Sequence, residues 1–383
     1  MKATASHPNT RYRPYFWEKF TSWSLSRSRS NSKSTMPIWV DQGLRALRDG
    51  LGQEAGSVPS LRYLHRVEVK DDDRSEERPP ASYRAEHATL VLFGLHQHGA
   101  TEPVHRPGVG LGTACRALRI HQFSGSATQR RLTAAATARD IEEVVQHLRS
   151  LISLFRQAHI KLDYTRLYLD LCVWLTPRQG RVLRAWGLQF TDPASEGSVE
   201  ASSGQSSAIP LWVTFVPGQT HAGAELAALR SGVGREAGTV PVMWPFYRTQ
   251  MGTDLRNQGA LTRDLVAEHA ALTLFGIHQH GRSRQVHVPG ISPGSACRLL
   301  LSKGRAEMER RLGNLLTSLD TDELTWHLRA LVPMLRQHSI GLDYNVLRKA
   351  LRHWDDPKRP DEQSHFRTVW DRDFHTGTDI PET

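Results

Sequence analysis

The chain contains one sequence twice. The stretch Ala85–Gly99, AEHATLVLFGLHQHG, returns as AEHAALTLFGIHQHG at Ala267–Gly281, 182 residues later. The offset becomes 180 residues further on, between Arg130 and Arg310. A unit of this length can bury its own core, unlike a solenoid repeat that needs its neighbours. The duplication therefore predicts two homologous domains in tandem.

The boundaries of the two copies follow from composition. Copy one is predicted to span residues 12–190 and copy two residues 209–375. Between them, residues 191–208 read TDPASEGSVEASSGQSSA, which contains no Lys or Arg and predicts a flexible linker reaching about 20–25 Å. Copy one also carries a Ser/Arg-rich insertion near 24–35, which is predicted to be disordered because it cannot bury apolar surface.

The spacing of apolar residues predicts an all-α fold. Residues 140–159 place one continuous apolar face at helical spacing: Ile141, Val144, Val145, Leu148, Leu151, Ile152 and Phe155. Copy two repeats this pattern, and Leu162-Asp163 and Leu342-Asp343 resemble helix N-caps preceded by an apolar residue. No segment alternates with a period of two. We therefore expect a helical bundle in each copy.

Composition bears on partners and compartment. The net charge is +10 and the pI is near 9.8, which favours a polyanion or an acidic protein surface, with an inert basic surface as the alternative. The three cysteines, Cys115, Cys172 and Cys297, form no CxxC motif. No apolar run reaches membrane-spanning length, and the first residues lack a secretory signal. The expected location is the cytoplasm, with no membrane partner.

Repeated histidines suggest a metal site at first sight, but their spacing argues against one. His96 and His98, which recur as His278 and His280, are two residues apart and point to different sides of a helix. Neither HExxH nor an adjacent carboxylate or thiolate completes a ligand set. The favoured interpretation is packing and helix-end histidines without a metal, and a metal-dependent enzyme stays as the alternative.

Other catalytic patterns are missing from the sequence. It contains no GxSxG nucleophile motif and no GxxxxGK[ST] phosphate loop. No pair of carboxylates is spaced for acid–base work. We therefore expect no enzymatic activity, no catalytic residue and no cofactor.

Basic residues that recur on three successive predicted helices are the strongest candidates for a binding site. Arg149 and Arg156, seven residues apart, would stand about 10 Å apart on one helix, and Arg329 and Arg336 repeat them. Such arginines can contact nucleic-acid backbone without reading sequence. Pairing with acids such as Glu142, Glu307 or Glu323 is the alternative. The full candidate set is Arg116, Arg119, Arg130, Arg131, Arg149, Arg156, Arg298, Lys303, Arg305, Arg310, Arg311, Arg329 and Arg336.

A series of short motifs then points to a family. Copy two contains Leu229-Arg230, Gly238-Thr239-Val240-Pro241, Leu274-Phe275-Gly276-Ile277-His278-Gln279, Glu309-Arg310-Arg311-Leu312, His327-Leu328-Arg329, Leu342-Asp343-Tyr344 and His353-Trp354. Copy one matches most of them in the same order. In this order and spacing, each copy resembles CasB, the small subunit of the type I-E CRISPR Cascade complex.

This resemblance implies a non-catalytic all-α subunit that serves in antiviral defence. In the family, two copies lie head to tail, bridge the guide-RNA-binding backbone subunits beside the large subunit, and help to hold the displaced strand of the target DNA next to the crRNA. Here the two copies are fused, and Val173-Trp174 replaces His-Trp in copy one. A protein–protein scaffold without nucleic-acid contact stays as the alternative. Which arginines face DNA, crRNA or a partner subunit stays open at this point.

Overall fold

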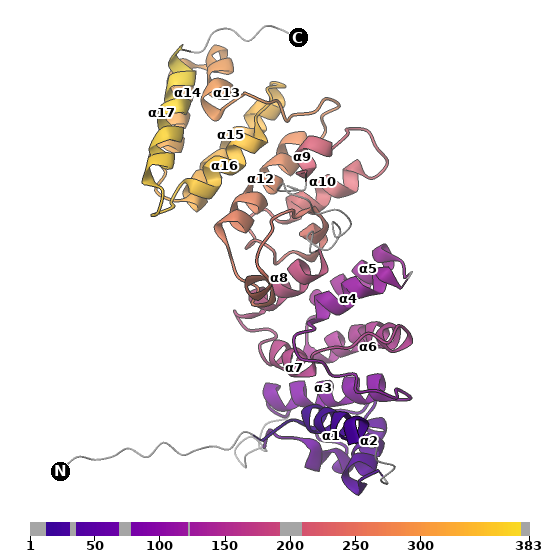
Figure 1. The fold of residues 1–383 in the computed structure, drawn as a ribbon. Coiled ribbons are helices and arrows are strands. Elements are labelled where there is room, and N and C mark those ends of the chain that lie inside the picture. The colour runs from indigo at the N-terminus through magenta and orange to yellow at the C-terminus, as the bar shows by residue number, and fades with distance from the viewer. Residues whose placement is uncertain (1–12, 31–35, 69–77, 122, 192–208, 377–383) are drawn as a thin grey trace, which may run out of the picture. The chain divides into compact units, whose positions relative to one another are not determined.

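A computed structural model describes residues 13–30, 36–68, 78–121, 123–191 and 209–376. The chain divides into two compact units between Val182 and Leu183. Within the described ranges the secondary structure consists of helices and turns, with isolated β-bridges and no strand. The predicted fold class, two all-α domains in tandem, is confirmed (Figure 1).

The first unit consists of helices that begin at residue 16. Its elements are α1 (Phe16–Ser30), α2 (Ile38–Asp49), the 3-10 helix η1 (Pro59–Leu64), α3 (Ala81–Gln97), α4 (Leu111–Ile120), α5 (Gly125–Ala136), α6 (Ile141–Gln157), α7 (Tyr164–Cys172) and the start of α8 (Gln179–Phe190).

The second unit takes in the rest of α8 and repeats the same order. Its further elements are α9 (Leu211–Thr214), α10 (Ala222–Ser231), η4 (Pro241–Phe246), α11 (Thr253–Asn257), α12 (Arg263–Gln279), α13 (Pro293–Leu299), η5 (Leu301–Lys303), α14 (Arg305–Thr317), α15 (Thr321–Gln337), α16 (Tyr344–His353) and α17 (Pro360–Thr376).

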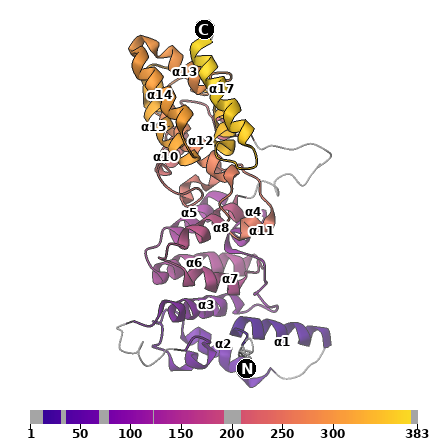
Figure 2. The same ribbon diagram turned by 90° about the vertical axis from the view of Figure 1, so that its left-hand side faces the viewer.

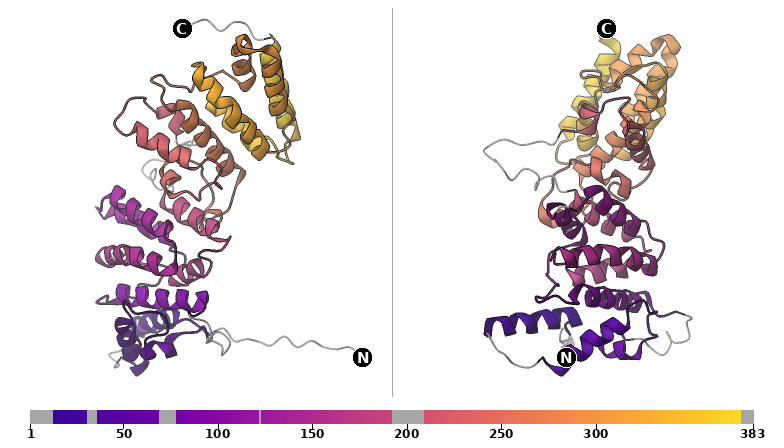
Figure 3. Two further views of the ribbon diagram at one scale, coloured as in Figure 1. Left: turned by 180° about the vertical axis from the view of Figure 1, so that it is seen from behind. Right: turned by 90° about the vertical axis from the view of Figure 1, so that its right-hand side faces the viewer.

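Each unit is built around the helix that contains the repeated stretch. In the first unit α3 packs against α2, α6 and α7, and in the second α12 packs against α10, α15 and α16 (Figures 1 and 2). Both central helices are apolar almost all round, so they are buried on every side. In Figure 3, α3, α6 and α5 form successive layers of the first unit. Also within the second unit, α17 lies against α13 and α14.

The glycine and the glutamine of the repeated stretch each have a packing reason. Gly94 lies so close to α2 that an added Cβ would come within 2.6 Å of the Cβ of Leu47, and Gly276 is held in the same way. The amide of Gln97 closes the loop after α3, because it donates to Glu102 O (3.0 Å) and accepts from Val104 N (3.0 Å). Gln279 makes the corresponding pair of bonds in copy two. The repeated stretch therefore holds the preceding helix and the following loop against the central helix in each bundle.

Helix termini follow the sequence pattern. Asp140 and Asp320 cap α6 and α15 by accepting from the backbone N–H groups of Glu143 and Glu323, each at 2.8 Å. Asp163 and Asp343 cap α7 and α16, as their sequence contexts predicted. The apolar face predicted for residues 140–159 is buried along α6.

Two segments differ from the sequence prediction. The helix α1 continues through Ser30, so the prediction of disorder from residue 24 is wrong for Ser24–Ser30. The aromatic first half of α1 packs in the core, and the polar residues that follow continue the same helix. Residues 31–35, 69–77 and 192–208 lie outside the described ranges. The domain bounds 12–190, 191–208 and 209–375 therefore stay a prediction.

The division between the units falls inside α8 because the helix's second half is held by groups of the second unit. Arg184 donates from Nε to Gly259 O (2.9 Å) and pairs with Glu236 (2.8 Å). Gln189 donates to the side chain of Asn257 at 3.1 Å. The residues from Leu183 onward are thus part of the second compact unit.

Candidate nucleic-acid interface

The repeated histidines of the central helices serve packing. His96 Nδ1 and the Tyr164 hydroxyl are hydrogen-bonded at 2.9 Å, and His278 and Tyr344 at 3.1 Å. Burial lowers the pKa of His96 and of His278 to about 4, so both rings are neutral at neutral pH. Within the described ranges, no group of three or more His, Cys, Asp or Glu side chains could hold a metal ion.

The remaining repeated histidines lie in loops or at helix ends. His105 accepts from the backbone N–H of Tyr164 through Nδ1 (3.1 Å), and His287 does the same for Tyr344 (3.2 Å). These bonds fix the start of α7 and α16. His98 is the exposed C-cap residue of α3. Together these contacts agree with the interpretation of packing and helix-end histidines.

The arginines on α6 and α15 do not stand free in solvent. Arg149, Arg156, Arg329 and Arg336 are all half-buried. Arg156 Nη1 donates to Leu95 O (3.5 Å), and Arg336 Nη1 donates to Ile277 O (3.3 Å). Each carbonyl belongs to the last turn of a central helix, where a cation interacts favourably with the helix dipole. These two arginines therefore help to hold the bundle together.

The arginines on α5 are exposed. Arg130 and Arg131 extend into solvent, and neither forms an ion pair with any acid that the structure describes. The helix Gly125–Ala136 itself contains no Asp or Glu. Both guanidinium groups are therefore available to an anionic partner.

The matching arginines on α14 are paired. Glu307 accepts from Arg310 at 2.8 Å and lies 2.7 Å from Arg311, while Arg305 pairs with Glu309 at 3.3 Å. The hydrogen bond from Arg310, together with the charges of both arginines, lowers the pKa of Glu307. The alternative that the sequence raised for Glu307 thus holds in copy two.

The other predicted residues lie on α4 and its counterparts. Arg116 and Arg298 are half-buried and Arg119 is exposed. The side chain of Lys303 lies outside what the structure describes. Glu142, a predicted partner of these arginines, pairs instead with Arg84 at 3.0 Å.

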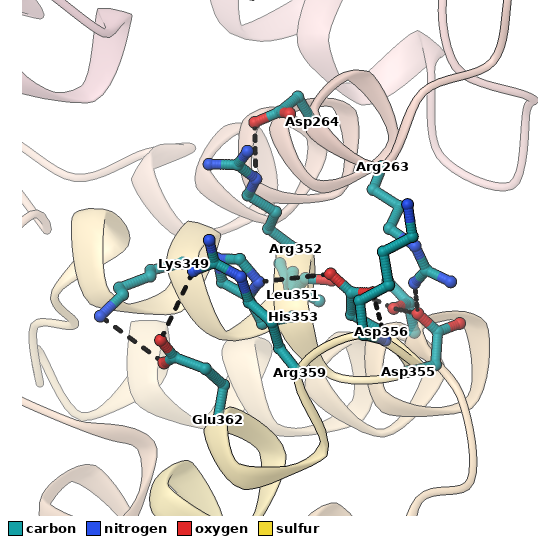
Figure 4. A network of polar contacts seen from close by, with 12 residues as sticks. Arg263, Asp264, Lys349, Leu351, Arg352, His353, Asp355, Asp356, Arg359 and Glu362 are labelled. Carbon is teal, nitrogen blue, oxygen red and sulfur yellow. Dashed lines mark hydrogen bonds and ion pairs between the residues drawn. The ribbon is translucent and has the colours of Figure 1, made fainter.

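Other basic residues of copy two also form ion pairs with acidic side chains (Figure 4). Asp264 pairs with Arg352 at 2.9 Å, and Arg263 pairs with Asp355. Lys349 and Arg359 both approach Glu362, at 3.7 and 3.9 Å. The charge of this region is therefore largely balanced within the second unit.

The sequence analysis missed one exposed basic residue. Arg139, in the turn between α5 and α6, is exposed; its backbone N–H donates to Glu143 (2.7 Å), while its guanidinium group forms no ion pair with a described acid. Its counterpart in copy two is Leu319, which is 80% exposed. A comparison of the two copies at the offset of 180 residues would have found this difference.

Comparisons with known proteins give the family. The sequence model of the CRISPR-associated protein Cse2 matches residues 44–190 and again residues 225–375. Among solved structures, CasB from Thermobifida fusca is 28% identical over 41% of this chain and 86% of its own, with a TM-score of 0.32. A Cse2-family protein from Thermus thermophilus is 21% identical over 43% of this chain and 93% of its own, also with a TM-score of 0.32. No curated protein matches the chain.

Among the described helices, none has the length and apolarity needed to cross a membrane.

Proposed function

Since the chain belongs to the CRISPR-associated Cse2 family and carries the family's domain twice, we propose that it serves as a fused pair of small subunits in a Cascade complex. One chain then takes the place of a two-copy small-subunit dimer. Fusion holds the second domain at a high effective concentration near the first, so both are recruited together. The double family match is the observation that supports this proposal.

The biochemical role that we propose is binding of nucleic-acid backbone without sequence preference. Exposed arginines contact phosphates and leave the base edges unread. Exchange of a DNA duplex for a guide-RNA heteroduplex is nearly balanced in free energy, so modest contacts to the displaced strand favour the open state. The net charge of +10 and the exposed arginines on α5 support this role.

Reconstitution with the other Cascade subunits and crRNA tests the proposal. We expect the chain to co-purify at one copy per complex and to protect thymines of the displaced strand from permanganate. The matched control is the complex assembled without this chain. Failure to join the complex would contradict the small-subunit assignment, and joining without protection would contradict the role at the displaced strand.

A scaffold without nucleic-acid contact is the second candidate. The ion pairs of Arg305, Arg310 and Arg311 favour it, because they neutralise a surface that the sequence predicted to bind phosphate. A scaffold would assemble normally and show no salt-dependent affinity for single strands in isolation. Binding that weakens steeply with salt would exclude it.

A further inference from the structure

The exposed faces of the two copies differ in charge where their folds agree. Copy one has Ala127 and Gln129 on α5, whereas copy two has Glu307 and Glu309 at the same positions of α14. The arginine pair itself is retained in both copies. The two copies thus share the cations, and only copy two has the acids that pair with them.

The local geometry makes this substitution decisive. Glu307 lies three and four residues before Arg310 and Arg311, the spacings at which side chains on a helix meet. Two guanidinium groups share its one carboxylate, at 2.8 and 2.7 Å. A phosphate that approached this pair would have to displace the carboxylate or accept its repulsion. No such cost applies at Arg130 and Arg131.

A second set of substitutions points the same way. Arg139 in copy one becomes the exposed Leu319 in copy two, and Gln146 on α6 becomes Trp326 on α15, which is 63% exposed. A cation and an amide can both contact phosphate and sugar oxygens, whereas leucine has no polar group, and tryptophan offers them only one indole N–H donor beside a ring face that can stack on a base. The copy-two face is therefore poorer in phosphate-binding groups along α15 as well as along α14.

We propose that copy one alone presents the principal backbone-binding surface of this protein, formed by Arg130, Arg131 and Arg139, and that its partner is a single-stranded nucleic acid. We name these three residues the copy-one arginine surface. From Arg130 to the end of α5 at Ala136 the helix rises about 9 Å, so the surface is long enough to follow several atoms of a sugar–phosphate chain. The inference depends on the proposed function and adds to it that the two copies bind unequally.

Matched double variants in the full chain test the inequality. Arg130→Gln with Arg131→Gln removes two charges from copy one, and Arg310→Gln with Arg311→Gln removes two from copy two. Affinity for a fluorescein-labelled mixed-sequence single strand is measured by anisotropy at several NaCl concentrations between about 50 and 200 mM. The copy-one variant should lose about tenfold in affinity and flatten the salt slope by about 1.4, since each single-strand phosphate contact contributes about 0.7. The copy-two variant should lose less than about threefold.

A reciprocal variant tests gain of binding. Glu307→Ala with Glu309→Gln gives α14 the residues that α5 has at Ala127 and Gln129, and it should raise the affinity at least about threefold. Thermal unfolding by circular dichroism checks that all variants fold, which we expect because Arg130, Arg131, Arg310 and Glu309 are exposed, and Glu307 and Arg311 are only half-buried.

The outcomes separate the two proposals. Equal losses from both arginine variants, with binding by the unsubstituted chain intact, would overturn the inequality and leave the proposed function standing. No measurable binding by the unsubstituted chain would overturn both. A larger loss from the copy-two variant would place the surface on α14 instead.

Discussion

A buried carboxylate in each central helix holds the preceding segment of the chain, and its neutralisation should be costly. Glu268 is 1% exposed and accepts hydrogen bonds from the backbone N–H groups of Arg248 and Thr249, both at 2.8 Å. The Thr249 hydroxyl also donates to it. Glu86 receives two corresponding backbone bonds in copy one. We predict that Glu268→Gln destabilises the second unit although it changes volume very little.

The magnitude follows from counting acceptors. Glutamine offers one carbonyl oxygen, so one of the two backbone N–H groups would face the side-chain amide and lose its acceptor. An unsatisfied buried donor costs about 1–3 kcal/mol, and the remaining bond is weaker because it loses its charge assistance. We expect a total of about 2–4 kcal/mol. For a unit of this size that corresponds to a fall in Tm of roughly 4–16 °C.

Two measurements on the full chain check this prediction. Urea unfolding followed by circular dichroism gives the free energy, and hydrogen exchange at the Arg248 and Thr249 amides gives the local effect. The control is Glu309→Gln, which removes an exposed ion pair worth about 0–1 kcal/mol. If the two variants unfolded alike and the two amides stayed protected, the argument from buried hydrogen bonds would be refuted.

Three further predictions concern stability. Burial lowers the pKa of three histidines to about 4, so their folded-state pKa lies below the unfolded value of about 6.5: His65, His96 and His278. The folded state therefore has its full stability above about pH 6.5 and loses free energy of unfolding as the pH falls towards 4. The loss is roughly 2 kcal/mol per histidine between about pH 7 and pH 5, and equal urea midpoints at the two pH values would contradict it. Gly294→Ala drives a Cβ into the carbonyl oxygen of Trp370, well inside van der Waals contact, and should lower the free energy of unfolding in urea by more than about 3 kcal/mol. Its contrast is Gly223→Ala, where the added Cβ meets nothing within 4 Å, and which should stabilise α10 by about 0.5–1 kcal/mol. His159 has a φ of 53° just after α6, so His159→Gly should raise the unfolding free energy by about 1 kcal/mol, and a decrease would show that its side chain contributes more than the strain costs.

The sequence predicted the architecture well because the relevant signals are local. Helical spacing of apolar residues along residues 140–159 indicated a buried face, and the structure has that face along α6. Asp163 and Asp343 were identified as caps from their immediate neighbours. The spacing of His96 and His98 argued for packing rather than for a metal site. In the structure, His96 is hydrogen-bonded to Tyr164, and Gln97 accepts from Val104 N in the loop after α3.

The sequence predictions failed where the outcome depended on which residues pack against each other in the fold. The run of Ser and Arg after residue 24 suggested disorder, yet α1 continues through Ser30 as an extension of a helix whose first half is anchored by buried Phe16, Trp17 and Phe20. Composition alone does not show that a polar stretch follows an anchored one. The hydrogen bond between His96 and Tyr164 joins residues far apart in the chain, and no spacing rule gives it.

The amino-acid sequence by itself determined the duplication, the helical class, the family and the set of basic residues, because periodicity, capping and repeated motifs are properties of the chain alone. Only the tertiary structure decided which of those basic residues meet solvent. The packing of α6 against α3 half-buries Arg149 and Arg156, and Glu307 pairs with Arg310, while Arg130 stays exposed. The physical reason is that a cation's availability depends on burial and on the nearest acid: burial is set by how the helices pack in space, whereas the Glu307–Arg310 pair follows from spacing along one helix.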